Sequence, residues 1–268
     1  MSKTIGIIAI KGGVGKTTTT LNLGATIAKE FNKKVLLVDA NFSAPNLGLH
    51  LGLTNPETTL HHVLLKRAHL PDAIHEYSEN LHIIPGSLLS KKVNPYLLKE
   101  KLRGIKKNYD VILLDSSPAL NEEILSTMIA SDKLLVVTSP DHPTLSTTMR
   151  AIRLAKQKKT PITGLILNKV RNKKFELNLN DIEEASGVPI LAVLPDDIKM
   201  LEALSNTKHI ADHAPKRDIA YEYKKLAACV LGEDYKDQRI KTKLKKFFFN
   251  DLPKEEVNRL HIKENFKK

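Results

Sequence analysis

Residues 11–18 form a glycine-rich segment whose residue types suit the binding of a phosphate chain. The segment reads Lys-Gly-Gly-Val-Gly-Lys-Thr-Thr and follows an apolar run at 5–10. Glycines let backbone N–H groups come close to an anion, and Lys16 would reach its far end. A helix that starts at Thr17 would direct its positive dipole end toward the same anion, and the Thr17 hydroxyl is suited to Mg²⁺. We therefore expect a cradle for phosphate and a metal ion here.

The segment departs from the common pattern G-x-x-x-x-G-K-[ST], because Ile10 occupies the position of the first glycine. Its sequence instead resembles the deviant Walker A loop of the MinD/ParA family of ATPases. The resemblance implies that ATP is the ligand and that Lys11 crosses a dimer interface to contact the partner's nucleotide. An incidental glycine-rich turn is the alternative, and the flanking strand and helix patterns argue against it. The residues expected to bind the nucleotide are Lys11, Gly12, Gly13, Val14, Gly15, Lys16, Thr17 and Thr18.

Asp115 is a second candidate ligand for the metal ion. It follows four apolar residues at 111–114. A strand there would carry its carboxylate to the carboxyl edge of a sheet, where α/β proteins place their ligands. An ordinary strand-ending aspartate is the alternative. The segment 115–119 resembles switch II of the same family, which implies that Asp115 and Thr17 serve a Mg²⁺ ion.

Asp39 ends another apolar run, and the segment 34–41 resembles the family's switch I strand. The resemblance implies that Asp39 orders the metal or the attacking water, so that the catalytic residues would be Lys11, Lys16 and Asp39. The family usually has a second aspartate two positions later, where this chain has Asn41. An amide keeps a hydrogen-bonding oxygen but lacks the charge and basicity of a carboxylate. We therefore expect slow hydrolysis of ATP to ADP and phosphate without an activating partner protein.

Two later segments resemble the family's adenine-binding loops. Asn168 follows an apolar run at 161–167 and is similar to an asparagine that contacts the base, although an asparagine at a strand end is also an ordinary turn residue. Pro195, Asp196 and Asp197 resemble the loop whose backbone lines the adenine. The resemblance as a whole spans residues 3–230, and the segment 46–52 is more similar to the MinD branch than to the ParA branch.

Seven short apolar runs, separated by helical patterns, predict the strands of one sheet. Most have apolar residues at consecutive positions, which is typical of strands covered on both faces. Helical stretches at 17–30, 95–107, 121–130 and 144–156 would serve as right-handed crossovers. We expect a doubly wound, mainly parallel α/β sheet with helices on both faces, and the resemblance implies a P-loop NTPase of the SIMIBI type. The predicted strands are 4–10, 34–39, 81–84, 110–115, 133–138, 161–167 and 188–194.

The C-terminal part of the chain is basic and predicts a tail. Residues 236–268 hold eleven Lys or Arg against five Asp or Glu, about half of the net charge of +12. We expect an ATPase domain at 1–232 and a tail at 233–268 with an amphipathic helix at 239–249. Ile240, Leu244, Phe247 and Phe248 would share one face of that helix, between basic residues. This composition is typical of a helix in an anionic membrane interface, which MinD-type proteins also carry. Packing on the domain body and nucleic-acid binding are the alternatives.

The cysteine count and the lengths of the apolar stretches exclude two further classes of protein. A single cysteine, Cys229, excludes a shared four-cysteine cluster and fits a reducing compartment, and no apolar stretch approaches the 18 to 20 residues of a membrane span. We expect a cytoplasmic ATPase, at times peripheral at the inner face of the cell membrane, that forms an ATP-dependent homodimer and regulates cell division or positioning. The alternatives are a ParA-like DNA-partition ATPase, with basic patches at 156–159 and 171–174, and a MinD-type regulator of flagellar or organelle positioning.

Overall fold

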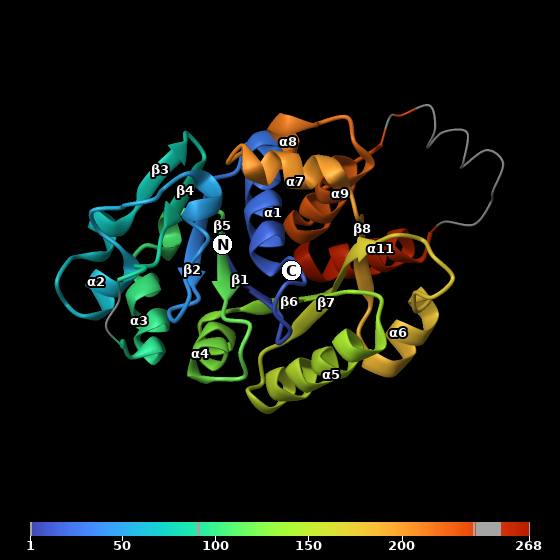
Figure 1. The fold of residues 1–268 in the computed structure, drawn as a ribbon, viewed down its shortest axis with the longest axis horizontal. Coiled ribbons are helices and arrows are strands. Elements are labelled where there is room, and N and C mark those ends of the chain that lie inside the picture. The colour runs from blue at the N-terminus through green and yellow to red at the C-terminus, as the bar shows by residue number, and fades with distance from the viewer. Residues whose placement is uncertain (1, 90–91, 238, 240–252, 268) are drawn as a thin grey trace.

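The computed structural model describes residues 2–89, 92–237, 239 and 253–267, which form one mainly parallel sheet with helices on both faces (Figure 1). Among the described residues the sheet has eight strands in the order β3-β4-β2-β5-β1-β6-β7-β8, and β3 runs antiparallel to β4. This topology confirms the predicted doubly wound α/β fold. The strands are β1 (Lys3–Ile8), β2 (Val35–Ala40), β3 (His75–Ser78), β4 (Leu81–Ile84), β5 (Val111–Ser116), β6 (Lys133–Thr138), β7 (Ile162–Val170) and β8 (Ile190–Pro195).

Each of the seven predicted runs coincides with a strand, and only β3 was missed. Strand β3 lies at the edge of the sheet, and its residues alternate between intermediate and exposed. Because β3 buries neither face, it has no apolar run that could reveal it. The central strands β2 and β5 are buried at every position, as their consecutive apolar residues indicated.

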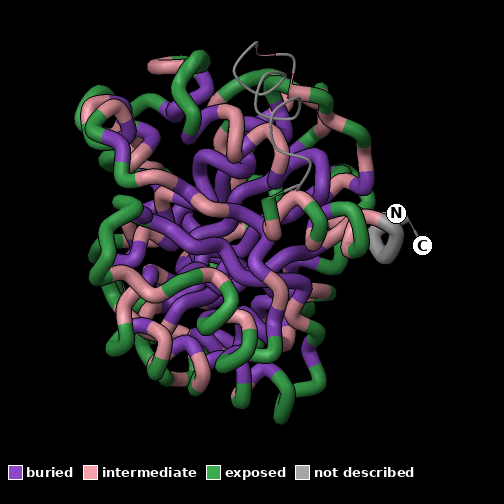
Figure 2. The backbone as a smooth tube through the Cα atoms, turned by 90° about the vertical axis from the view of Figure 1, so that its right-hand side faces the viewer, coloured by how far each residue is buried: buried purple, intermediate pink, exposed green. Residues whose placement is uncertain are grey.

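The helices cover the sheet in two layers. Helices α1, α7, α8 and α9 pack on one face in a single large core, and α2 to α6 pack on the other face in two smaller cores (Figure 1). Figure 2 shows the buried backbone running through the middle of the molecule. The helices are α1 (Lys16–Phe31), α2 (Leu60–Leu64), α3 (Leu98–Arg103), α4 (Glu122–Ala130), α5 (His142–Gln157), α6 (Leu179–Ser186), α7 (Ile198–Ser205), α8 (Ile210–His213), α9 (Asp218–Leu231) and α11 (Lys254–Lys267), with short 3₁₀ turns η1 (Leu49–Leu51), η2 (Leu70–Ala73), η3 (Pro95–Leu97) and η4 (Lys106–Asn108).

The predicted helix at 95–107 is divided into η3, α3 and η4. Pro95 at the start fits the first turn of a helix, where no N–H donor is needed, and Gly104 lies between α3 and η4. The crossover therefore has the expected position but not one continuous helix.

Strand register brings two carboxylates together. Asp39 of β2 is paired in register with Asp115 of β5, and both side chains are fully buried at the carboxyl edge of the sheet. The apolar runs that precede them fix this position, because each strand is anchored by the core on both faces. Two adjacent buried carboxylates need cationic partners, and the loop after β1 supplies one.

Helix α11 shows that packing extends beyond the predicted boundary at residue 232. It lies against α9 and β8, and its side chains bond to carbonyls of the edge strand. Asn258 Nδ2 donates to the Ile190 carbonyl at 2.9 Å and Arg259 Nη1 donates to the Leu191 carbonyl at 2.8 Å. Arg259 is buried and pairs with Glu222 at 3.1 Å. Residues 254–263 thus pack against the folded body.

The predicted amphipathic helix at 239–249 lies almost entirely outside the described residues, which include Arg239 but not Ile240, Leu244, Phe247 or Phe248. The Arg239 guanidinium lies over the Tyr221 ring, 3.7 Å from its centroid, and pairs with Asp237 and Asp218. The chain is therefore attached to the body at the first residue of this segment and again at α11.

Replacement of Arg259 by alanine should loosen α11 and expose Cys229. The Cys229 thiol is buried 3.8 Å from the Arg259 carbonyl, and burial raises its pKa to about 11. Because Cys229 is the one cysteine in the sequence, its reaction with a disulfide reagent at pH 8 reports the opening of α11. We expect Arg259→Ala to accelerate labelling on the order of tenfold. His261→Ala, an exposed position on the same helix, is the control; equal rates in all three proteins would contradict a docked α11.

Candidate functional site

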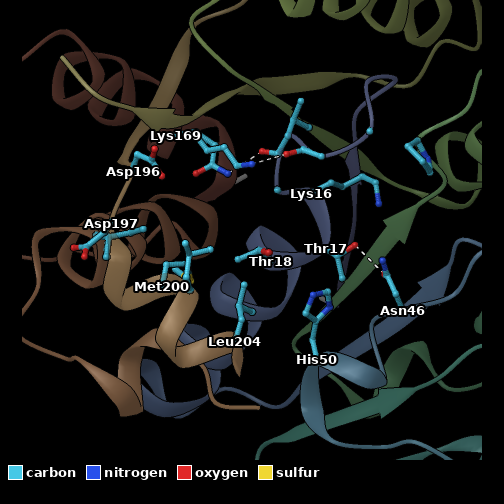
Figure 3. A pocket seen from close by; sticks show the side chains of 18 of the residues that line it. Lys16, Thr17, Thr18, Asn46, His50, Lys169, Asp196, Asp197, Met200 and Leu204 are labelled. Atoms are coloured by element: carbon cyan, nitrogen blue, oxygen red, sulfur yellow. Dashed lines mark hydrogen bonds between the residues drawn. The ribbon is translucent and has the colours of Figure 1, made fainter. Parts of the chain in front are cut away.

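A pocket of about 300 Å³ lies at the carboxyl ends of the central strands (Figure 3). Its lining includes the whole glycine-rich loop and both segments predicted to meet the base. The predicted residues that line it are Lys11, Gly12, Gly13, Val14, Gly15, Lys16, Thr17, Thr18, Asn168, Pro195, Asp196 and Asp197. Segments more than 150 residues apart in the sequence thus share one cavity.

The loop has the conformation that an anion cradle needs. Gly13 and Gly15 have φ angles of 77° and 90°, in the left-handed region that favours glycine. A Cβ atom on Gly15 would lie 2.2 Å from Asn168 Nδ2, so the loop packs too closely there for any side chain. Helix α1 begins directly after Gly15 without a side-chain cap or an acidic residue in its first turn. The N–H groups of this turn therefore remain suited to a negatively charged ligand.

Asn168 is bound to the loop itself. Its Nδ2 donates to the Val14 carbonyl at 2.8 Å, and the neighbouring Lys169 Nζ donates to the Gly13 carbonyl at 2.7 Å. These two bonds hold the end of β7 against the glycine-rich loop. Asn168 lines the pocket, and it also supports the backbone that would cradle phosphate.

Lys16 and Thr17 converge on the carboxylate of Asp115. Lys16 Nζ lies 2.7 Å from Asp115 Oδ1, and Thr17 Oγ1 donates to Asp115 Oδ2 at 2.6 Å. The side chain of Lys16 is 7% exposed and that of Asp115 is fully buried. A buried charge pair of this kind is stable only while each charge keeps a partner. Lys16, Thr17 and Asp115 thus place a cation, a hydroxyl and a carboxylate together at the N-terminus of α1. The hydroxyl and the carboxylate are oxygen ligands that suit Mg²⁺, and the cation suits a phosphate group.

Asp39 lies beside this pair, and neither Asp39 nor Asp115 is among the residues that line the pocket. Its carboxylate accepts hydrogen bonds from the backbone N–H of Leu47 at 2.9 Å and of Asn41 at 3.2 Å. Burial, and next the charge of Asp115, raise the pKa of Asp39 to about 7. Because this pKa is raised, ionisation of Asp39 destabilises the folded state, and that cost grows as the pH rises toward 7. A cation bound nearby would favour the ionised form.

Lys11 is held within its own chain. Its Nζ donates to Thr144 Oγ1 at 2.6 Å and lies 3.3 Å from Asp141 Oδ1. Burial opposes the ionisation of Asp141, but hydrogen bonds from Ser139, Thr144 and Lys11 outweigh it and lower the pKa of Asp141 to about 2. The Lys11 side chain is 41% exposed. It therefore lies at the mouth of the pocket, on the side of α5.

The Asn41 Oδ1 atom is buried without a hydrogen-bond partner among the described residues, on a residue that lines the pocket. Burial of a polar atom without a hydrogen bond costs free energy, which a bound water or ion can offset. The glycine cradle and the Lys16–Thr17–Asp115 cluster fit a metal-bound phosphate chain.

The sequence did not reveal the apolar wall opposite the loop. Met200, Leu201 and Leu204 of α7 line the pocket with Ile219 and Tyr223 of α9. These residues form ordinary helical patterns, so their spacing carried no functional signal. Asn46, His50, Pro118 and Lys169 were missed as well, although each neighbours a predicted segment. Asp196 and Asp197 pair with Arg171 and Arg217, so their carboxylates are already neutralised.

Comparisons with known proteins identify the family. A family model described as an AAA domain matches residues 2–162. A MinD septum site-determining protein of Thermotoga maritima is 30% identical over 87% of this chain and 89% of its own. The solved structure of MinD complexed with Mg-ADP from Pyrococcus horikoshii is 33% identical, with a TM-score of 0.79 over 85% of this chain and 95% of its own. This chain belongs to the MinD/ParA family of P-loop ATPases. An uncharacterised ATP-binding protein of Methanocaldococcus jannaschii is also similar, at 32% identity over 91% of this chain and 93% of its own.

The comparisons confirm the family that the glycine-rich loop with Lys11 and Lys16 predicted. The family model matches the part of the chain that contains this loop, β2 and β5, and the relatives extend the similarity over most of the chain. Within the described residues no helix is long and apolar enough to cross a membrane.

Proposed function

We propose that this protein is a MinD-like ATPase that binds Mg-ATP, dimerises on ATP, and hydrolyses it slowly to switch its attachment to a membrane surface. The convergence of Lys16 and Thr17 on Asp115, beneath a glycine cradle, carries the proposal. Mg-ADP in the similar structure from Pyrococcus horikoshii supports it. The process served would be cell division or positioning, in the cytoplasm and at the inner face of the cell membrane.

Each charged group of the site has a role in this proposal. Lys16 would leave Asp115 for the phosphate chain, which has more negative charge to offer. Thr17 and Asp115 would hold the metal ion, which supplies charge neutralisation to the phosphates. Asp39 would order water next to them. The apolar side chains of α7 and α9 would cover the base opposite Asn168.

Asn41 supports slow hydrolysis. Its Nδ2 donates to the Ala44 carbonyl at 2.5 Å, and its buried oxygen has no hydrogen-bond partner among the described residues. An amide oxygen can orient a water molecule but takes up no proton at neutral pH. An activating partner protein would then set the rate.

Replacement of Asn41 by aspartate should accelerate single-turnover hydrolysis, because it adds a base where the amide can only orient water. We expect an increase of at least about a hundredfold, at the low end of the 10²- to 10⁴-fold that general-base catalysis typically contributes. The measurement is the release of phosphate from ATP with enzyme in excess. Asn55→Asp, outside the pocket, is the matched control for added charge. An unchanged or lower rate in Asn41→Asp would contradict the proposed cause of slow turnover.

Lys11 is proposed to act across the dimer. To reach a partner's nucleotide, Lys11 must leave Asp141 and Thr144. A half-exposed ion pair is worth about 0 to 1 kcal/mol, so this movement costs little.

Attachment to nucleic acid is less favoured than attachment to a membrane, because Arg171 already pairs with Asp196 and Lys169 already bonds to the Gly13 carbonyl.

Lys11→Ala should abolish the ATP-dependent dimer and, with it, binding to membranes. Two marginal membrane helices joined in one dimer bind far more tightly than one. We expect wild-type protein to elute as a dimer with ATP and a monomer with ADP, and to co-sediment with anionic vesicles only with ATP. Lys92→Ala, a lysine outside the nucleotide pocket, is the control. If Lys11→Ala still forms the dimer with ATP, Lys11 has no role across the interface. Equal vesicle binding with ATP and ADP would exclude the membrane switch.

A further inference from the structure

Asn22 is a fully buried polar residue of α1 that the roles above leave unused. It lies one turn after Thr18, in the helix that begins at the glycine-rich loop. An amide at such a position has two N–H groups and an oxygen to satisfy inside the protein, and a group left without a partner there costs free energy. The partners of Asn22 therefore show which elements it holds together.

The Asn22 side chain joins three helices. Its Nδ2 donates to the Thr18 carbonyl of α1 at 2.8 Å and to Met200 Sδ of α7 at 3.5 Å. Its Oδ1 accepts from the backbone N–H of Ile210, the first residue of α8, at 2.7 Å. The bonds to Met200 and Ile210 span 178 and 188 positions of the sequence. Asn22 thus connects the first turns of α1, next to the phosphate cradle, with the far side of the pocket.

Helix α7 buries few of its side chains, so its position depends on contacts such as this one. Two of its eight residues are buried, Met200 among them, whereas Ile198 and Leu201 are 62% and 58% exposed. Met200 and Leu201 also line the nucleotide pocket (Figure 3). The ion pair of Asp197 holds the start of α7, and Asn22 holds its middle.

We propose that Asn22 is a positioning residue for the base of the nucleotide. It acts through Met200, because by holding α7 to α1 it keeps the apolar wall at the distance from the phosphate cradle that a nucleoside requires. The proposal rests on the proposed nucleotide-binding function. Asn22 itself does not line the pocket. The affinity contributed by the base should therefore depend on Asn22, and the affinity contributed by the diphosphate should not.

Asn22→Leu tests the proposal by calorimetric titration with Mg-ADP and with Mg-pyrophosphate. Leucine is similar in size to asparagine but makes none of its hydrogen bonds. We expect the affinity for ADP to fall about tenfold and that for pyrophosphate to stay within about threefold of wild type. Thr26→Val, one turn further along α1, is the matched control. Thr26 is fully buried, and its Oγ1 has no hydrogen-bond partner in the described part of the chain, so Thr26→Val should bind both ligands like wild type.

The double variant Asn22→Leu/Met200→Ala shows whether Asn22 acts through Met200. Met200→Ala alone should also weaken the binding of ADP and not that of pyrophosphate, because Met200 lies in the apolar wall. If both residues act through this wall, the double variant loses no more affinity than the more damaging single variant, whereas independent residues give additive losses. Additive losses would overturn the proposal.

The two ligands separate this role from a general structural one. Equal losses of ADP and pyrophosphate binding in Asn22→Leu would mean that Asn22 supports the glycine-rich loop, and they would overturn the proposal, as would unchanged ADP binding. If Asn22→Leu does not fold, Met200→Leu replaces it, since it keeps the size of the side chain but removes the sulfur acceptor. We then expect a loss of about threefold for ADP alone, and wild-type affinity would contradict the proposal. If wild-type protein binds neither ligand, the proposed function fails, and not this inference alone.

Discussion

The buried ion pair between Lys16 and Asp115 is the interaction on which the rest of the structure depends. Its two atoms lie 2.7 Å apart, and almost no solvent reaches either side chain. Taking two charges out of water costs several kcal/mol each, which their attraction offsets only with good geometry and further hydrogen bonds. Thr17 and Thr20 supply those bonds to Asp115. The pair thus holds the start of α1, directly after the glycine-rich loop, against the end of β5. It also places a cation where a phosphate chain could bind it.

The neighbouring strands make this arrangement possible. Register between β2 and β5 places Asp39 beside Asp115, and one cation between two carboxylates leaves one of them poorly compensated. The raised pKa of Asp39 expresses that imbalance. A metal ion would correct it, since a divalent cation favours the ionised form of both carboxylates. The charges of the free protein therefore suit a metal-bound anion at this place.

Much of the fold could be predicted because it depends on local patterns. Consecutive apolar residues in β2, β5 and β6 predict buried parallel strands, and the positions of Asp39 and Asp115 follow from where those runs end. Strand β3 has no such pattern. Helix α11 was assigned to a tail because its sequence is strongly charged, and its docking through Arg259 and Asn258 depends on carbonyls of β8 that no local pattern reveals.

The candidate site divides in the same way. The loop and its two carboxylates could be predicted, since their residue types and spacing express their chemistry. The hydrogen bonds of Asn168 to Val14 and of Lys11 to Thr144 join residues more than 130 positions apart, and the apolar wall from α7 and α9 looks like any helix core. The membrane face of the predicted segment at 239–249 stays a prediction, because it lies outside the described residues.

Lys16 is proposed to move from Asp115 to a bound phosphate chain, and a titration of wild type and Lys16→Met with a fluorescent ATP analogue and Mg²⁺ tests this role. We expect saturable binding by the wild type and an affinity at least about a hundredfold lower in the variant, because a charge-assisted contact and the pairing of a buried carboxylate disappear together. Binding of equal strength in both proteins would exclude this role of Lys16.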